Sequence, residues 1–213
     1  MLPIGASLGR GLNLEGGDAD GVVKTIEFLI SMNRGFNVDV GERVLVVGGG
    51  DVAMDAARTA LRTSDYESKE TDRPTMTDAL DVARSAARAG ARQIQVMSLE
   101  ARSEMPAHDF EIEEAEHEGI TFISRRGPRR IVVSDGMVAG LETVGVSSVF
   151  DEEGRFSPVF DEEDLQIFDV DTVILAIGQA IDLDALDPEA PTISPHRTIQ
   201  VDDDTGATSL DGV

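Results

Sequence analysis

The sequence predicts an α/β fold: a Rossmann-like three-layer nucleotide-binding domain, in which a parallel sheet is flanked by helices and by an antiparallel β-meander. Three observations predict it. A continuous apolar run over residues 44–47, typical of a buried strand in a parallel sheet, enters a glycine-rich turn. A helical pattern over residues 52–62 leaves that turn. From residue 130 to residue 170, strand-like runs follow one another with turns between them instead of helices.

The turn carries the pattern G-x-G-x-x-A, which is typical of dinucleotide-binding sites. Gly48 permits the tight turn, Gly50 lets a pyrophosphate approach the backbone, and Ala53 lets the helix pack closely on the strand. A helix that begins near Asp51 directs free N–H groups and the positive end of its dipole toward phosphates. A turn of this shape without a ligand is the alternative, because the pattern also occurs by chance. The residues expected to line the pyrophosphate are Gly48, Gly49, Gly50, Asp51, Val52 and Ala53.

The remaining elements follow in order along the chain. We expect a helix over residues 20–33, a charged surface insertion over 63–78 and a second helix over 79–88 that echoes residues 53–62. Strands are expected over 93–99 and 120–124, with a helix over 107–118 between them that Gly119 ends. The meander is expected over 130–134, 137–149 and 165–170, and a last buried strand over 172–177. This divides the chain into a leading segment (1–38), a nucleotide-binding domain (39–179) and a trailing segment (180–213).

Composition excludes several classes of function. The net charge of -23 argues against binding to nucleic acid or to an anionic membrane. The absence of cysteine removes thiolate nucleophiles and cysteine-ligated metals, and three scattered histidines predict no metal site. No apolar run is long enough to span a membrane and no signal peptide is present, so we expect a cytoplasmic protein. The acidic, arginine-rich composition fits either a salt-rich cytoplasm or a GC-rich genome.

Five motifs, in this order, resemble the pyridine-nucleotide-binding portion of flavoproteins that have two dinucleotide-binding domains. This group, the FAD-dependent pyridine nucleotide oxidoreductases, contains thioredoxin reductase, and the glutamate synthase small (beta) subunit-like branch is the most similar. The resemblance implies an NAD(P)H-dependent oxidoreductase in which this domain presents the nicotinamide for hydride transfer to FAD. The motifs lie at residues 4–7, 46–62, 104–107, 118–120 and 173–179.

The sequence departs from the family pattern in two places. It has no second G-x-G-x-x-G for FAD, and it stops at Asp211-Gly212-Val213, where the family continues into a segment that contacts FAD. We therefore expect one domain of a longer flavoprotein, which neither binds FAD nor is active alone. The resemblance implies two partners: the FAD-binding domain of the same parent protein, and a subunit of the iron–sulfur or glutamate synthase large type. No catalytic residue is predicted, because a hydride-donor domain needs no acid–base pair.

The position after the second strand of the domain selects between NADH and NADPH. Relatives that use NADPH carry paired arginines there, whereas this chain has Leu99 and Glu100. A carboxylate binds the ribose hydroxyls and repels a 2′-phosphate, so we expect NADH. Arg102 could still reach a phosphate, which keeps NADPH possible, and Glu100 as a plain surface carboxylate is the alternative. Gly178, after the last buried strand, is a further candidate for contact with the cofactor.

Other patterns have plainer interpretations. Residues 105–107 are expected to form a structural turn more than a nicotinamide contact, and the arginines at 125–126 and 129–130 to pair with acids. His108 is expected only to start a helix. A nucleotide-sensing or subunit-docking module without redox activity remains a competing function, and an S-adenosylmethionine-dependent methyltransferase a weaker one. A short-chain dehydrogenase is excluded, because Tyr66, the single tyrosine, is followed four residues later by Glu70 instead of lysine.

Overall fold

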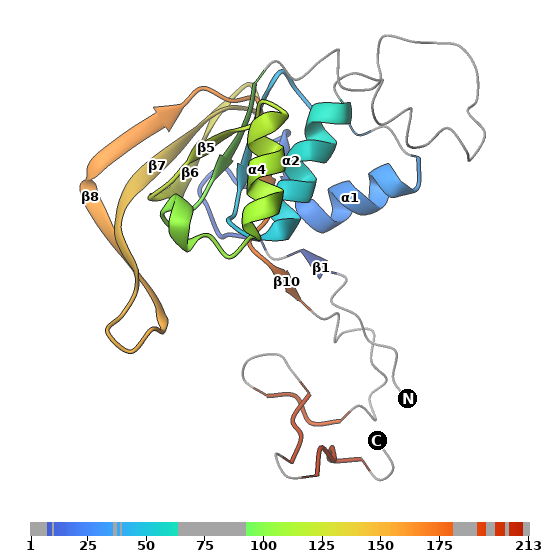
Figure 1. Cartoon of the computed structure of the whole chain (residues 1–213). Coiled ribbons are helices and arrows are strands. Elements are labelled where there is room, and N and C mark those ends of the chain that lie inside the picture. Colours follow the sequence, from blue (N-terminus) through green and yellow to red (C-terminus); the bar gives the residue numbers. More distant parts are fainter. Residues whose placement is uncertain are drawn as a thin grey trace.

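The computed structural model describes residues 8–9, 11–35, 38, 40–63, 93–180, 191–194, 199–202 and 205–210 (Figure 1). The expected insertion, beyond Thr63, and the expected helix over 79–88 lie outside the described residues. No helix in these ranges is long and apolar enough to cross a membrane.

Five parallel strands form the central sheet, in the order β2-β9-β3-β4-β5. The middle strand is β3, and its residue Val46 lies opposite Val96 of β4 on one side and Ile174 of β9 on the other. Because β3 is central, the turn that follows it opens at the middle of the carboxyl edge of the sheet, where ligands of such folds bind. The strands are β2 (Val22–Lys24), β3 (Arg43–Val47), β4 (Gln93–Met97), β5 (Thr121–Ile123) and β9 (Thr172–Leu175).

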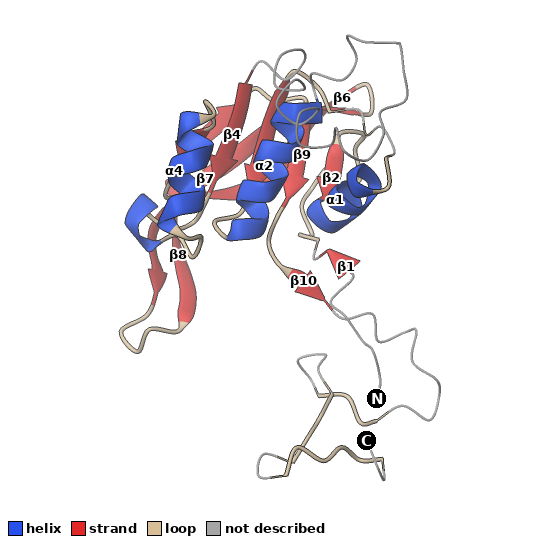
Figure 2. Ribbon diagram, turned by 45° about the vertical axis from the view of Figure 1, so that its right-hand side comes forward, coloured by secondary structure: helices blue, strands red, loops and turns tan. Residues whose placement is uncertain are grey.

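Three helices cover one face of this sheet: α1 (Thr25–Asn33), α2 (Asp51–Thr63) and α4 (Asp109–His117) (Figure 2). Phe28, Met54 and Ile112, one from each helix, are fully buried in the same core. Apart from Met54, the completely buried residues of α2 are alanines, which allows its backbone to approach the strands. Gly119 follows α4 at φ +93°, and its N–H donates to the Glu116 carbonyl, as expected for a glycine that ends a helix.

An antiparallel sheet of β6 (Arg126–Ser134), β7 (Met137–Phe150) and β8 (Phe156–Phe168) covers the other face. A second apolar core lies between the two sheets, and Leu45, Leu141 and Val173 are completely buried in it. The three layers of the predicted fold are confirmed. A turn with positive φ at Asp135 and Gly136 joins β6 to β7, which matches the right-handed twist of a hairpin.

Two regions differ from expectation, the start of the central sheet and the meander. The predicted helix over 20–33 starts at Thr25, because Val22–Lys24 pairs in parallel with β9 as an edge strand. Gly21, at φ +101°, turns the chain into that strand, and β-branched valines favour it. The outer strands of the meander are also longer than predicted, since β6 begins at Arg126 and β8 at Phe156.

The chain enters and leaves the described domain at one place. The short strands β1 (Leu8–Gly9) and β10 (Gln179–Ala180) pair in antiparallel fashion, with Leu8 opposite Ala180 (Figure 1). The leading and trailing segments of the sequence therefore run side by side at this pair.

Candidate dinucleotide-binding site

The glycine turn after β3 is shaped first by packing. Gly48 lies at φ +149°, and a methyl group on it would overlap the backbone carbonyl of Ala176 after β9. Its N–H donates to the Met97 carbonyl at 2.8 Å, and the Ala176 N–H donates to the Val47 carbonyl at 2.8 Å. Gly48 is thus needed to let three neighbouring strand ends meet, before any ligand is considered.

Gly50 has a different environment. Apart from the residues next to it in the chain, no atom of the described residues lies within 4 Å of the position that a Cβ would take there. Its carbonyl accepts the Ala53 N–H at 2.8 Å and so starts α2. The N–H groups of Asp51 and Val52 make no backbone hydrogen bond within the described part of the chain. Open space in front of free helix N-terminal amides is the arrangement in which proteins bind phosphate.

Gly49 is enclosed by Glu100, which is predicted to bind the ribose, and by Pro106, which lies just before α4. A methyl group on Gly49 would lie 2.9 Å from Oε2 of Glu100 and 3.3 Å from Cδ of Pro106. The Gly49 carbonyl accepts the Ala107 N–H at 3.0 Å. Residues 105–107 therefore hold the turn in place as a structural segment, which agrees with their plainer interpretation, and Met105 is buried.

Glu100 has a fixed backbone and a free carboxylate. Its carbonyl accepts hydrogen bonds from the buried Ser98 hydroxyl at 3.0 Å and from the Arg125 N–H at 3.2 Å. No residue in the described ranges donates a hydrogen bond to its half-buried carboxylate. This carboxylate stands beside the glycine turn with its acceptor capacity unused.

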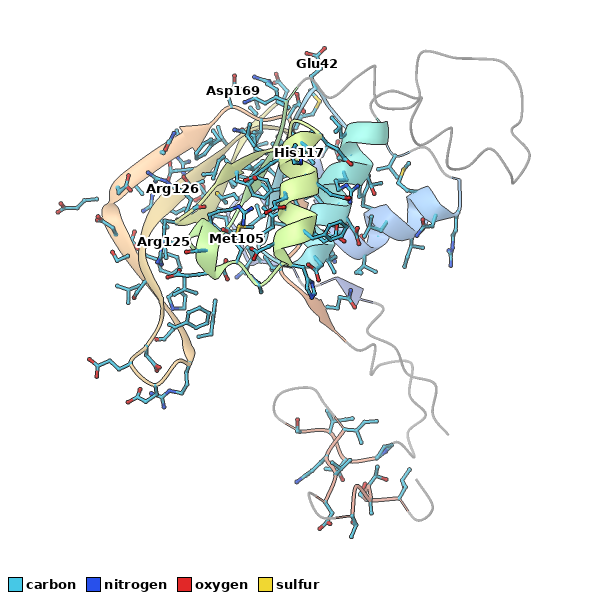
Figure 3. The ribbon with its side chains drawn as sticks, in the orientation of Figure 1. Glu42, Met105, His117, Arg125, Arg126 and Asp169 are labelled. Carbon is cyan, nitrogen blue, oxygen red and sulfur yellow. The ribbon has the colours of Figure 1, made fainter. Side chains whose placement is uncertain are left out.

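The arginines near Glu100 are all engaged by other acids, as predicted for the pairs at 125–126 and 129–130. Arg125 pairs with Glu104 of the short helix η2 (Arg102–Glu104) at 2.8 Å, and Arg126 pairs with Asp164 of β8. Figure 3 shows Arg125 and Arg126 on the side of the domain that carries the meander. Arg129 and Arg130 both bind Glu142 of β7, whose side chain is only 8% exposed. Bonds from Arg130, and then from Arg129, hold the pKa of Glu142 below its usual range.

Arg102 is directed toward α4. Its guanidinium lies 3.2 Å from the Glu116 carboxylate and 5.9 Å from the centre of the Phe122 ring. Both contacts occupy the side chain that could otherwise reach a phosphate at the turn.

Asp51, the first residue of α2, is bound by His108, the residue before α4. Oδ1 of Asp51 accepts the His108 N–H at 2.8 Å, and Oδ2 lies 2.8 Å from Nδ1 of the imidazole. These bonds, the backbone one most of all, lower the pKa of Asp51. His108 stands at the start of α4 as expected, without a side-chain bond that caps the helix. Its contact with Asp51 was not foreseen, because the two residues are 57 positions apart.

The other candidate residues contribute to the packing and the chain direction around the site. Ala53 is fully buried and packs α2 on the sheet, while Val52 is half-buried in the first turn. Gly178 lies between β9 and β10 at φ +103°, which suits a change of chain direction, and its contact with a cofactor stays a prediction. In the described ranges, no three His, Asp or Glu side chains are grouped to hold a metal ion.

Comparison with known proteins places this geometry in a family. The chain is 34% identical to the beta subunit of an NADP(+)-dependent formate dehydrogenase from Moorella thermoacetica, over 91% of this chain and 24% of that protein. It is 30% identical to a putative glutamate synthase [NADPH] small chain from Cereibacter sphaeroides, over 100% of this chain and 48% of that one. The chain thus spans less than half the length of these relatives.

Solved structures agree on the fold. Mycobacterium tuberculosis FprA in complex with NADPH superposes with a TM-score of 0.60 at 15% identity, over 95% of this chain and 52% of FprA. Thioredoxin reductase from T. acidophilum superposes with a TM-score of 0.59 at 14% identity, over 96% of this chain and 52% of the reductase. The family profile described as pyridine nucleotide-disulphide oxidoreductase matches residues 3–213. This chain therefore belongs to the pyridine nucleotide-disulphide oxidoreductase family.

Proposed function

We propose that this chain is the NAD(P)H-binding domain of a flavin-dependent oxidoreductase, that it binds NADH, and that it presents the nicotinamide to FAD in the parent protein. The observation that carries the proposal is the free Glu100 carboxylate beside a glycine turn that opens at the middle of the sheet edge. The nicotinamide supplies the hydride, and the chain supplies position and specificity.

The residues present suit a dinucleotide. Gly50 leaves space for the pyrophosphate, and the free N–H groups of Asp51 and Val52 can donate to its oxygens. Gly49 brings Glu100 close to the same turn, so that one molecule can place its phosphates on the turn and its adenosine ribose on the carboxylate.

The choice of NADH rests on charge. The relatives compared above carry NADP(+) or NADPH in their names, whereas this chain has the carboxylate of Glu100 at the position expected to select the cofactor. Glu100 can accept hydrogen bonds from two ribose hydroxyls and repels a 2′-phosphate, whereas Arg102 is held by Glu116. Each described arginine near Glu100 is paired with a carboxylate other than Glu100 and so is not free to bind a 2′-phosphate.

The domain also requires an electron acceptor that it does not supply itself. Chain entry and exit at the β1–β10 pair suit a domain inserted into a flavin-binding domain. Within the predicted leading segment (1–38), β2 and α1 belong to the nucleotide-binding unit itself, and the predicted trailing segment (180–213) leads out of it. The matched relatives are longer, and several are named as subunits. We therefore propose that hydride passes to FAD in the parent protein and from there to a partner subunit of the iron–sulfur or glutamate synthase large type.

Calorimetric titration of the chain with NADH and with NADPH tests the proposal. We expect tighter binding of NADH, and we expect Glu100→Arg to move the NADH/NADPH affinity ratio toward NADPH by about 10- to 100-fold, the value of one or two charge-assisted hydrogen bonds. Glu113→Arg is the matched control, because Glu113 is exposed on α4 and the charge change is identical. An unchanged ratio in the Glu100 variant would remove Glu100 as the selector. Failure to bind either nucleotide would overturn the proposed function.

A further inference from the structure

Asp51 raises an electrostatic problem at the site. Its carboxylate belongs to the first residue of α2, where the negative pyrophosphate is expected to bind. Two negative charges placed close together repel each other. The side chain is 44% exposed, so water screens the repulsion only in part. Its lowered pKa keeps Asp51 ionised through the neutral range.

His108 is held where it can offset this charge. The Ala107 N–H bonds to Gly49, the His108 N–H bonds to Oδ1 of Asp51, and Nδ1 of the ring faces Oδ2. An Nδ1–H can donate to the ionised Oδ2, and the charge of the ring then depends on whether Nε2 also carries a proton. The ring is 79% exposed and can exchange that proton with water. When Nε2 is protonated, the Asp51–His108 pair is neutral, and when it is not, the pair carries one negative charge.

Resting on the proposed function, we propose that His108 is a further residue of the cofactor site: it positions the Asp51 carboxylate and neutralises it, so that the pyrophosphate binds best while the imidazole is protonated.

The described acids that are nearest to His108 along the chain pair with arginines. Asp109 lies 3.7 Å from Arg102, Glu111 pairs with Arg58 at 3.2 Å, and Glu104 pairs with Arg125. The glycine turn and residues 105–107 carry no ionisable side chain. Asp51 is therefore the carboxylate whose negative charge His108 offsets most directly.

The test is the affinity of the chain for NAD⁺, measured by calorimetry at about pH 5.5 and about pH 8.5, on either side of the range in which an imidazole titrates. We expect affinity to fall by about fivefold at the higher pH, the size of one or two unit-charge interactions across several ångströms of water-exposed site. His108→Gln should bind with the weaker affinity at both pH values. Asp51→Asn should bind with the stronger affinity at both.

His117→Gln is the matched control. His117 is the last residue of α4, and Figure 3 shows it toward the opposite end of that helix from Met105. This variant should keep the pH dependence of the unaltered chain. A pH dependence that survives in His108→Gln, or an affinity that is equal at both pH values in the unaltered chain, would overturn the inference alone. Absence of NAD⁺ binding at both pH values would overturn the proposed function and this inference with it.

Discussion

Gly48 and Gly50 lie two residues apart in the same turn, yet substitution by alanine should affect a different property at each position. At Gly48 a methyl group would overlap the Ala176 carbonyl, and the positive φ adds backbone strain. At Gly50 a methyl group meets no described atom within 4 Å. We expect Gly48→Ala to damage the fold and Gly50→Ala to damage nucleotide binding alone.

The magnitude follows from what must move. To admit the methyl group, the ends of β3 and β9 must separate, which costs about 1–3 kcal/mol for overpacking. The separation also weakens the 2.8 Å bonds that Gly48 and Ala176 donate to neighbouring strands, at about 0.5–1.5 kcal/mol each. The free energy of unfolding should therefore fall by about 2–6 kcal/mol, out of a total on the order of 5–15 kcal/mol. The midpoint of thermal unfolding should fall by about 4–24 °C.

The measurement is urea and thermal unfolding followed by far-ultraviolet circular dichroism, because the chain has no tryptophan for fluorescence. Gly50→Ala serves as the matched control and should unfold within about 1 kcal/mol of the unaltered chain. Its affinity for NADH should fall, since the methyl group occupies the space intended for the pyrophosphate. Equal stability of the Gly48 and Gly50 variants would refute the argument that the contact with Ala176 requires glycine.

Two further predictions concern buried and clustered charge. Glu142 has its pKa lowered by Arg130 and Arg129, so its contribution to stability is complete above the ordinary carboxyl pKa and is lost as pH falls through the lowered one. Glu142→Gln should be less stable than the unaltered chain at neutral pH, and the difference in unfolding midpoint should shrink below about pH 4.5; a difference that is constant down to pH 3 would contradict this. Arg58 of α2 lies within 3.2 Å of carboxylates of Glu111, Glu114 and Glu118, and its side chain is 18% exposed. Arg58→Met should lower the free energy of unfolding by about 1–2 kcal/mol at low ionic strength and by less in molar KCl, and an effect that does not depend on salt would refute the electrostatic origin.

The parts of the fold that local sequence determines were predictable. The unit of β3, turn and α2 is encoded in one continuous stretch, where valines, glycines and alanines each favour the local structure that forms. The edge strand β2 was missed, because Val22–Lys24 continues the apolar pattern of the following helix. Its strand pairing depends on β9, about 150 residues further along the chain. The start of β8 was missed because both faces of that strand are exposed, which leaves no alternation of apolar and polar residues to read.

In the candidate site too, local sequence predicts some features, whereas others depend on tertiary packing. The glycines and Glu100 were predicted, since a motif and a position after a strand indicate them. The free state of the Glu100 carboxylate could not be predicted, because it depends on which acids engage Arg102 and Arg125. The Asp51–His108 contact joins residues that only the packing of α4 beside α2 brings together, and no spacing in the sequence signals it.

The β1–β10 pair has a consequence for how such a domain can be exchanged between proteins. Leu8 and Ala180 are opposite each other, so the chain returns to within about one interstrand spacing of the point where it entered. A host protein that accepts this unit has to open only one backbone connection, and its own two ends stay as close as neighbouring residues on paired strands. The whole nucleotide-binding unit can then be exchanged as a cassette, and a host could change its preference between NADH and NADPH without altering a residue of its own core.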